Sequence, residues 1–254
     1  MTPPSLLSRT RVVLVRPFFP ENIGSVARAM ANSDLARLVI AEPGTALPRH
    51  PNAYKLASHA APILDQAQVV STLDEALEGA SLVVGTTQHR LQDVPMLAPR
   101  EAAQLAARHA VGGGEVVLLF GNEKNGLTRE ALLRCHQLVR IPTGANPSLN
   151  LSQAVMIVAY EWLLASMDQA DAEETPLTAI ATEPAVASVA AALAEALLAG
   201  GFFKPHNRAL KEALLRRVLS RAILSPEEAS VFRGLAHRLA SVLARATPTE
   251  PAGR

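Results

Sequence analysis

Short apolar runs alternate with segments of helical periodicity over the first two thirds of the chain. The runs are rich in valine, leucine and isoleucine, and the segments between them repeat apolar residues every three or four positions. Strands that alternate with helices are typical of a parallel sheet, so we expect an α/β fold with a mostly parallel sheet. The expected strands cover residues 11–16, 37–41, 82–85, 115–120 and 138–142.

Helices are expected between these strands. Asn22 can cap the first of them, which would carry apolar residues from Ile23 to Met30 on one face. Residues 44–68 are less regular, and we expect a loop and a short helix there. Further helical segments are expected over residues 74–78, 99–110, 128–135 and 151–166.

The pattern changes after the last of these helices. Residues 167–184 are acidic, contain two prolines and show no period, which is typical of a linker. From residue 185 onward the sequence has helical periodicity throughout. We therefore expect a first domain at residues 1–166, a linker at 167–184 and a small all-α domain at 185–254, with helices over 185–199, 207–222 and 226–246.

The last of these helices has the clearest start. Ser225, Pro226 and Glu228 stand where a capping box places its N-cap, N1 and N3 residues. The helix that follows is expected to bury one apolar face. That face would be formed by Phe232, Leu235, Ala236, Leu239 and Leu243.

The composition fits a folded protein whose charge is unevenly distributed. Of the 254 residues, 49% are hydrophobic, which is enough for a buried core and excludes a wholly disordered chain. The formal net charge is only +1, yet residues 1–174 hold 14 basic and 17 acidic residues, whereas residues 175–254 hold 10 and 6. Such a difference between the two parts indicates a separate basic module.

Several classes of protein are disfavoured by the sequence. Cys135 is the single cysteine, so no intrachain disulfide can form, and we expect a reducing cytoplasm. The first residues lack the pattern of a signal peptide. The most apolar long segment, residues 149–167, contains polar residues that favour a buried helix over a membrane span. The seven histidines show no metal-binding spacing, so we expect no metal site.

Three segments are richer in polar residues than packing requires. They span residues 20–29, 120–127 and 141–154, and two of them follow an expected strand, as Gly85-Thr86-Thr87 does. Open α/β sheets bind ligands at the carboxyl ends of their strands, so we expect a binding site there. Taken singly, the residues of these segments also have structural explanations as caps, turn residues or surface charges. These residues are Asn22 and Ser148, Gly121 and Gly126, and Arg28.

The second segment has the spacing of a phosphate-binding P-loop but lacks its key residue. Gly121 to Thr128 has the GxxxxG pattern and the final threonine, whereas Leu127 stands where a P-loop carries lysine. That lysine supplies the positive charge at the β- and γ-phosphates. We therefore disfavour a nucleotide hydrolase and keep it as an alternative.

Taken together, the three segments resemble the motifs of the SPOUT methyltransferases of the TrmH/TrmJ family. NIGSVARA at 22–29 resembles the first motif, LLFGNEKNGLT at 118–128 the second, and IPTGANPSLNLSQAV at 141–155 the third. The helical extension resembles that of the TrmJ subfamily, through LLAGGFF at 197–203 and EEASVFRGLAHRL at 227–239. The resemblance covers nearly the whole chain.

The resemblance implies a fold and an activity. Members of the family have an α/β domain with a deep C-terminal trefoil knot, bind S-adenosylmethionine and work as homodimers. By analogy with the TrmJ subfamily, the substrate would be the 2′-hydroxyl of nucleotide 32, a cytidine or a uridine, in the anticodon loop of tRNA. Residues 143–147 are shorter than in some members, which leaves the nucleoside preference open. The alternatives are another tRNA or rRNA position, and a non-catalytic RNA-binding relative.

The resemblance also implies roles for individual residues. A guanidinium stays protonated at neutral pH, so we expect Arg28 to grip the target phosphate and polarise the 2′-hydroxyl. Asn22 would orient Arg28, and Glu123 would hold Arg28 or the loop around it. Ser148 and Asn150 would complete the catalytic set. The cofactor would lie on Thr86, Thr87, Gln88, Gly121, Ile141, Pro147, Ser148 and Leu149, bound mostly through backbone groups.

The basic helices would extend the contact with RNA. Residues 201–245 hold nine basic and three acidic residues, and Arg233 and Arg238 lie largely off the apolar face of the last helix. We expect these arginines to contact phosphates, with a solvated helix face as the alternative. Aromatic residues make up only 4% of the chain, so we expect RNA readout to depend on backbone shape, with little base stacking.

Overall fold

The computed structural model describes residues 6–44, 47–89, 96–170 and 180–246. The chain forms two compact units, of which the first ends at Ala179 and the second begins at Ile180. The boundary therefore falls within the segment expected to be a linker, whose residues 171–179 lie outside the described part of the chain.

The first unit is built on a sheet in which all neighbouring strands are parallel. Its strands in the described residues are β1 (Thr10–Val15), β2 (Arg37–Ala41), β3 (Gln68–Val70), β4 (Leu82–Thr86), β5 (Met96–Leu97), β6 (Val116–Phe120) and β7 (Gln137–Val139). The order across the sheet is β3-β2-β1-β6-β4-β7-β5. As a result, the carboxyl ends of β6, β4 and β7 lie next to one another.

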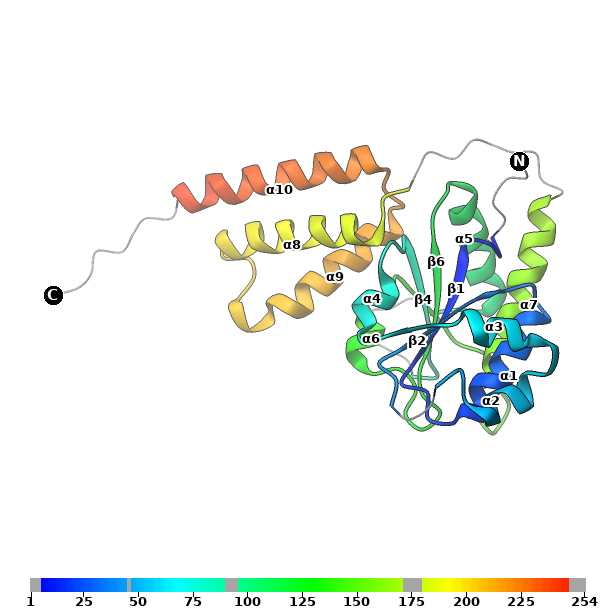
Figure 1. The fold of residues 1–254 in the computed structure, drawn as a ribbon. Helices are drawn as coiled ribbons and strands as arrows, with labels where there is room; N and C mark the ends of the chain where they lie inside the picture. Colours follow the sequence, from blue (N-terminus) through cyan, green and yellow to red (C-terminus); the bar gives the residue numbers. More distant parts are fainter. Residues whose placement is uncertain (1–5, 45–46, 90–95, 171–179, 247–254) are drawn as a thin grey trace. The chain divides into compact units, whose positions relative to one another are not determined.

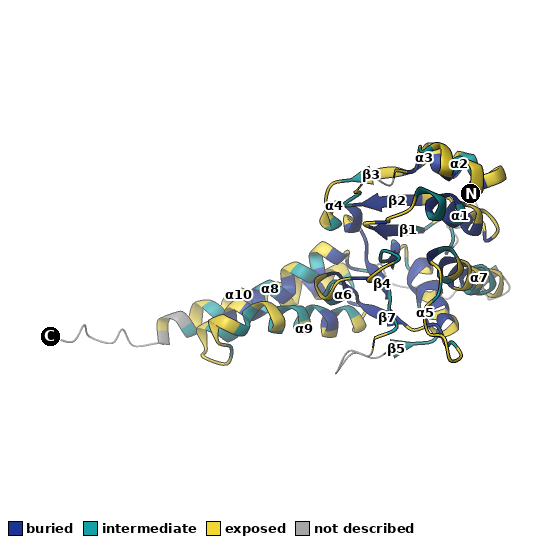
Figure 2. Ribbon diagram, turned by 90° about the horizontal axis from the view of Figure 1, so that it is seen from below, coloured by how far each residue is buried: buried dark blue, intermediate teal, exposed yellow. Residues whose placement is uncertain are grey.

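Helices cover both faces of this sheet (Figure 1). They are α1 (Pro20–Ala31), α2 (Pro51–Ala57), α3 (Ala61–Gln66), α4 (Leu73–Leu77), α5 (Pro99–Val111), α6 (Arg129–Leu133) and α7 (Leu151–Ala170), with a 3-10 turn at Ser58–Ala60. Val12 and Leu118 share a buried cluster with α1, α5 and α7, whereas Val13 and Leu119 face α4 and α6. Strands covered on both faces form nearly continuous apolar runs, and the central strands are almost wholly buried (Figure 2).

The expected α/β fold with a mostly parallel sheet is confirmed, and all five expected strands are present. The short strands β3 and β5 are additional, and they lie at the two edges of the sheet, where a strand needs no long apolar run. β7 ends at Val139, before the expected end at residue 142, because its partners β4 and β5 end opposite it at Thr86 and Leu97. The trefoil knot stays a prediction.

Asn22 does not cap α1, so this expectation is wrong. The helix begins at Pro20, with Phe19 as its N-cap, and no side chain caps it. Proline suits the first turn of a helix because its missing N–H would have no partner there, and Pro20 therefore sets an earlier start. Asn22 lies inside the first turn, and its amide is free for contacts elsewhere.

Helices extend into the expected linker from both sides, so the segment without helix is shorter than expected. α7 continues to Ala170, past the expected end at residue 166, because residues 167–170 contain no helix breaker. α8 begins at Glu183, since Pro184 occupies the first turn, where proline is tolerated. Part of the acidic segment at residues 167–184 therefore belongs to the end of α7 and the start of α8.

The second unit consists of helices around a small apolar core. Its described helices are α8 (Glu183–Ala199), α9 (Arg208–Arg221) and α10 (Pro226–Ala246), with a 3-10 turn at Pro205–Asn207. The capping box of α10 is confirmed: Glu228 N donates to Ser225 Oγ at 3.1 Å, and Ser225 N donates to Glu228 Oε2 at 2.7 Å. The core is formed by Ala181, Val186, Val189, Ala190, Leu219, Leu224 and Ala229.

The expected apolar face of α10 is largely exposed, which corrects the sequence-based expectation. Leu235 is 60% exposed and Leu239 is 41% exposed, whereas Ala236 is fully buried. α10 packs on α8, which is rich in alanine. A close approach to such a helix places the small residues Ala229 and Ala236 on the buried side, and it leaves longer side chains outside.

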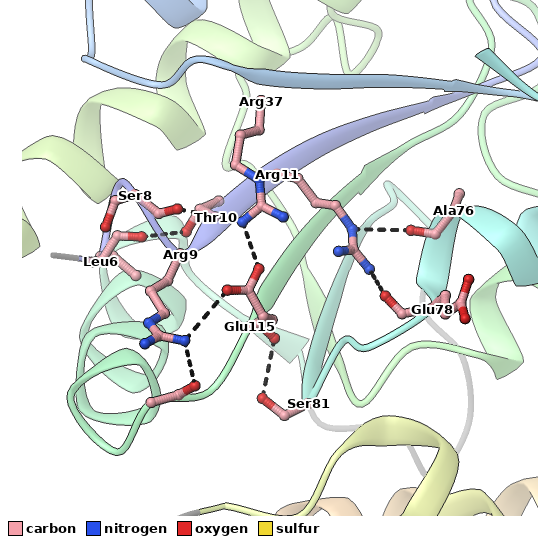
Figure 3. A network of polar contacts seen from close by, with 11 residues as sticks. Leu6, Ser8, Arg9, Thr10, Arg11, Arg37, Ala76, Glu78, Ser81 and Glu115 are labelled. Atoms are coloured by element: carbon pink, nitrogen blue, oxygen red, sulfur yellow. Dashed lines mark hydrogen bonds and ion pairs between the residues drawn. The ribbon is translucent and has the colours of Figure 1, made fainter. Parts of the chain in front are cut away.

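A polar network ties together the amino ends of the central strands (Figure 3). Glu115 accepts a hydrogen bond from Arg37 at 2.5 Å and forms an ion pair with Arg9 at 3.5 Å. Arg11 donates from Nε to the carbonyl oxygen of Ala76 at 3.1 Å. These contacts lie at the edge of the sheet opposite to the carboxyl ends of the strands, so we assign the network to the scaffold.

His109 makes the stability of this scaffold depend on pH. Its Nε2 lies 3.0 Å from Oγ of the buried Ser81, and burial lowers the pKa of His109 to about 4, with the Ser81 contact opposing this. The unfolded chain takes up this proton near pH 6.5 and the folded chain only near pH 4. We therefore expect this group to lower the free energy of unfolding by up to about 3 kcal/mol as the pH falls from 6.5 to 4.

Urea unfolding measured between pH 7 and pH 4 checks this expectation. His109→Gln should remove this part of the pH dependence, because glutamine does not titrate. His59→Gln, which changes an exposed histidine of the same unit, should keep it. Equal pH dependence in the wild type and in His109→Gln would contradict the assignment.

Gly24 allows α1 and α2 to pack closely. A Cβ atom on Gly24 would lie 2.0 Å from the carbonyl oxygen of Ala53, a backbone atom of α2 that cannot move aside. We expect Gly24→Ala to destabilise the protein by about 1–3 kcal/mol, although alanine favours helices.

Gly234→Ala is the matched control and should instead stabilise the protein by about 0.5–1 kcal/mol, because Gly234 is exposed within α10 and a Cβ atom there meets nothing within 4 Å. Thermal unfolding of both variants checks the two signs, and a stabilised Gly24→Ala would contradict the packing argument.

Candidate active site

A cavity of about 460 Å³ opens at the carboxyl ends of β4, β6 and β7. Its volume lies within the range of about 300–1,000 Å³ that is usual for ligand pockets. The walls come from the residues after β4, the loop after β6 and the stretch between β7 and α7. Every residue expected to hold the cofactor lines this cavity: Thr86, Thr87, Gln88, Gly121, Ile141, Pro147, Ser148 and Leu149.

The loop after β6 folds back on itself beside the cavity. Oδ1 of Asn122 accepts hydrogen bonds from the backbone N–H groups of Lys124 at 3.0 Å and Asn125 at 2.8 Å. Asn122 also forms an isolated antiparallel bridge with Gly126. The closure requires glycine at position 121. Any other residue would place a Cβ atom 2.0 Å from the carbonyl carbon of Gly126, which is too close.

This loop is not built as a P-loop. A P-loop directs its backbone N–H groups at phosphates, whereas two N–H groups of this loop are bonded to Asn122. Leu127, at the position of the P-loop lysine, is buried in the core. Thr128 caps α6 by accepting a hydrogen bond from Ala131 N at 3.3 Å. The structure therefore argues against the nucleotide hydrolase.

The cavity wall contains a buried acceptor that a ligand could satisfy. Gln88 donates weakly from Nε2 to the carbonyl oxygen of Ile141 at 3.5 Å, and its Oε1 is buried without a hydrogen-bond partner in the described part of the chain. Leaving such an acceptor unpaired is costly, so a donor on a bound ligand is expected there. Thr86 is held in place by a bond from Oγ1 to the carbonyl oxygen of Leu119 at 3.2 Å.

A chain of three polar side chains joins the three motifs. Asn150 donates from Nδ2 to Oδ1 of Asn22 at 3.1 Å, and Asn22 donates from Nδ2 to Oε1 of Glu123 at 2.7 Å. Glu123 also lines the cavity. The structure thus brings together three of the residues expected to be catalytic, although Asn22 lies 101 positions from Glu123 in the sequence.

Glu123 holds the loop in front of α1. Its carboxylate accepts hydrogen bonds from the backbone N–H groups of Phe18 at 2.8 Å and Phe19 at 3.2 Å, in addition to the bond from Asn22. Bonds to an ionised carboxylate are the stronger class of hydrogen bond, so they fix the start of α1 against the loop after β6. Of the two roles expected for Glu123, these contacts correspond to holding the loop around Arg28.

Asn150 also begins α7. Its Oδ1 accepts a hydrogen bond from Ser152 N at 2.9 Å, and Asn150 N donates to Oε1 of Gln153 at 3.2 Å. This reciprocal pair is a capping box, which fixes Asn150 in position. Ser148 is therefore not the cap. It is exposed, its N–H donates to Oδ1 of Asn146 at 3.2 Å, and it lines the cavity.

Arg28 lies on a second cavity, of about 640 Å³, between α1 and α7. Leu149 lines both cavities. Arg28 is exposed, and its guanidinium makes no hydrogen bond or ion pair with the described residues. The expectation that Asn22 orients Arg28 finds no contact in the structure, because the Asn22 amide is bonded to Glu123 and Asn150. A guanidinium without a protein partner is suited to bind a phosphate.

Arg233 and Arg238 are exposed residues of α10, in the second unit, and they do not line either cavity. Part of the basic excess of this unit is internal. Arg216 forms an ion pair with the buried Glu183, and Arg217 is itself buried. The exposed arginines of α10 therefore account for much of the charge that this unit offers to a partner.

Three residues of the site were not singled out from the sequence. Phe18 and Phe19 are exposed beside the cavity, and Lys124 Nζ lies 3.6 Å from the centroid of the Phe18 ring. The signal that could have found them is a pair of aromatic residues between two prolines, Pro17 and Pro20, directly after a strand.

The described residues contain no group of three or more histidine, cysteine, aspartate or glutamate side chains that could hold a metal ion. None of their helices is both long enough and apolar enough to cross a membrane.

Comparison with known proteins identifies similar sequences and folds. Residues 9–160 match the SpoU rRNA Methylase family. The tRNA (cytidine/uridine/adenosine-2′-O-)-methyltransferase TrmJ of Pseudomonas aeruginosa is 39% identical over 241 residues, which cover 91% of this chain and 93% of that protein. The tRNA (cytidine/uridine-2′-O-)-methyltransferase TrmJ of Pectobacterium atrosepticum is 37% identical over 239 residues, covering 91% and 96%. The crystal structure of TrmJ from Z. mobilis ZM4 superposes with a TM-score of 0.74 at 31% identity, covering 91% of this chain and 98% of that one.

Proposed function

This chain belongs to the SpoU rRNA methylase family, and from this premise we propose that it is an S-adenosylmethionine-dependent tRNA 2′-O-ribose methyltransferase. The observation that carries the proposal is that residues of three separate motifs meet at the edge of one cavity: Asn150, Asn22 and Glu123 form a hydrogen-bonded chain, and Glu123 lines the cavity. The similarity to the TrmJ relatives also spans both units of the chain.

The proposed target is the 2′-hydroxyl of nucleotide 32, a cytidine or uridine in the tRNA anticodon loop. Two similar relatives are named for the methylation of cytidine and uridine in tRNA, and one of the names adds adenosine. The nucleoside preference therefore has to be measured. The alternatives are another position in tRNA or rRNA and a non-catalytic RNA-binding relative. Arg28, exposed and without a partner among the described residues, favours the enzyme.

The walls of the first cavity, at the carboxyl ends of β4, β6 and β7, fit the proposed cofactor. S-adenosylmethionine supplies, when bound, an electrophilic methyl group. The unpartnered Oε1 of Gln88 can accept a hydrogen bond from the cofactor, and the close turn at Gly121 brings the backbone up to the cavity. Thr86, Thr87, Ile141, Pro147, Ser148 and Leu149 would form the rest of the cofactor site.

We assign to Arg28 the task of holding and polarising the ribose hydroxyl. Its guanidinium would bind the phosphate of the target nucleotide and donate a hydrogen bond to the 2′-oxygen. Because a guanidinium stays protonated at neutral pH, it cannot accept the hydroxyl proton, which would leave to solvent. Asn22, Glu123 and Asn150 would act as positioning residues that hold α1 and α7 in register. Ser148 would lie between the cofactor and the hydroxyl.

We also propose that the protein works as a homodimer. Leu56, Met156 and Ile157 line the second cavity, and each of these apolar residues is more than a third exposed. Tyr160, one turn further along α7, is 50% exposed. A second copy that covered this face would bury these side chains and enclose the site around Arg28.

The exposed arginines of α10 should strengthen RNA binding without reading its sequence. We expect Arg233→Ala combined with Arg238→Ala to weaken tRNA binding and to lower the slope of log affinity against log salt by about one per lost phosphate contact. Titrations at several salt concentrations check this expectation. Arg108→Ala, an exposed arginine of α5, serves as the matched control. An unchanged salt slope in the double variant would leave these arginines as a solvated helix face.

A methyl-transfer assay tests the proposed function. The purified protein is incubated with S-adenosylmethionine labelled in its methyl group and with unmodified tRNA or ribosomal RNA. We expect label in tRNA. Label in ribosomal RNA alone would favour the rRNA alternative, and binding of RNA without any transfer would favour the non-catalytic relative. A tRNA substrate and a single cysteine, Cys135, that is buried and forms no disulfide both fit a cytoplasmic location.

A further inference from the structure

Two phenylalanine rings stand exposed next to the candidate active site. Phe18 is 49% exposed and Phe19 is 45% exposed, whereas Pro17 behind them is buried. The chain contains only six phenylalanines, so this adjacent pair holds a third of them. Large apolar side chains are usually buried, so an exposed pair of aromatic rings indicates a surface that binds a partner.

The backbone of this segment is held so that its polar groups face the protein. The N–H groups of Phe18 and Phe19 both donate to the carboxylate of Glu123. Phe19 has the extended conformation, with φ −114° and ψ 124°, that a residue before proline prefers. The segment is thus rigid before any ligand arrives, which lowers the entropic cost of binding.

A cation completes this surface. Lys124 Nζ lies 3.6 Å from the centroid of the Phe18 ring, and the two phenylalanine rings meet edge to face, with centroids 4.7 Å apart. Lys124 also lines the first cavity. We refer to Phe18, Phe19 and Lys124 as the aromatic patch.

We propose that the aromatic patch stacks a nucleobase that neighbours the methylated nucleotide in the RNA, while Lys124 meets the adjacent phosphate. The proposal rests on the proposed function and adds a binding subsite to it. Unpaired bases of RNA loops stack on exposed aromatic rings, and a lysine nearby favours the phosphate between them. Phe18 and Phe19 do not line the first cavity, so the patch takes a neighbour of the target nucleotide.

A second copy of the chain is the other conceivable occupant of the patch. Neither phenylalanine lines the second cavity, around which the apolar residues of the proposed dimer face gather. An ammonium group on the ring also suits a polyanion better than an apolar contact between subunits. The observations therefore favour RNA.

Fluorescence of a labelled anticodon stem-loop tests the proposal in the absence of the cofactor. 2-Aminopurine is placed, in separate RNAs, on each side of the target nucleotide, because stacking on an aromatic ring quenches its emission. We expect quenching at one of these positions with the wild-type protein. The double variant Phe18→Leu, Phe19→Leu should lose this quenching and bind the RNA roughly 5- to 100-fold more weakly. The hydrogen bonds from residues 18 and 19 to Glu123 come from backbone N–H groups, so the double variant keeps them.

Two matched variants sharpen the result. Phe19→Trp should retain quenching because it keeps an aromatic surface, and Phe202→Leu, which removes a ring that is 83% exposed in the second unit, should behave as wild type. Unchanged quenching and affinity in the double leucine variant would overturn the proposal. A loss of self-association in that variant, with RNA affinity intact, would assign the patch to a second copy and also overturn it. A wild-type protein that binds no RNA at all would instead count against the proposed function.

Discussion

Replacing Arg28 with alanine is expected to lower the rate of methyl transfer to tRNA by about 100- to 1,000-fold while leaving the affinity for S-adenosylmethionine unchanged. The size follows from the loss of a positioned charge that acts on the reacting oxygen. The two effects are separated because Arg28 lines the second cavity and is absent from the walls of the first cavity, where the cofactor is proposed to bind. Single-turnover rates and calorimetric titration of the cofactor measure the two quantities.

Two further variants make this expectation specific. Arg28→Lys keeps the positive charge but loses the planar fork that can hold a phosphate and a hydroxyl at once, so it should recover only part of the rate. Arg49→Ala removes another exposed arginine of the same unit, which donates to the backbone of Asp65, and should transfer at the wild-type rate. If Arg28→Ala lost cofactor affinity as well, the proposed division of roles between the two cavities would be wrong.

Replacing Gly121 with alanine is expected to abolish measurable binding of S-adenosylmethionine. The added Cβ atom would lie 2.0 Å from the carbonyl carbon of Gly126 and 2.1 Å from the nitrogen of Leu127. Both are backbone atoms, so the loop after β6 would have to open, and a wall of the first cavity would be lost. Calorimetry of the cofactor measures the effect, and circular dichroism verifies that the variant is folded.

Gly44→Ala is the matched control for this substitution. A Cβ atom at Gly44 meets nothing within 4 Å, and Gly44 does not line the first cavity, so cofactor affinity should stay at the wild-type value. A folded Gly121→Ala that bound the cofactor with wild-type affinity would show that the loop after β6 is not part of the cofactor site.

The scaffold follows from local patterns wherever burial on both faces makes those patterns strong. Each residue of β6 is buried, and its apolar run predicts the strand directly. The edge strand β3 is only three residues long and partly exposed, so it leaves little trace in the sequence. The start of α1 is set by Pro20, a local residue whose effect outweighs the capping propensity of Asn22.

The residues of the candidate site could be predicted from the sequence, but the contacts between them could not. The residues within one motif are neighbours in the chain, so their common location follows from the order of the strands. The bond between Phe18 N and Glu123 joins positions 105 residues apart, and no local pattern specifies it. The placement of Arg28 on the second cavity, which of the expected cofactor residues only Leu149 also lines, likewise depends on how α7 packs against α1.

The most direct test of the proposed activity is to locate the methyl group on the RNA. A full-length tRNA transcript is incubated with the protein and S-adenosylmethionine and then partly hydrolysed in alkali, which cleaves each linkage through its free 2′-hydroxyl. A 2′-O-methyl group blocks cleavage at one linkage only. We predict a single gap in the ladder, at nucleotide 32. A complete ladder from RNA that has nevertheless taken up labelled methyl would place the modification on a base and contradict 2′-O-ribose methylation.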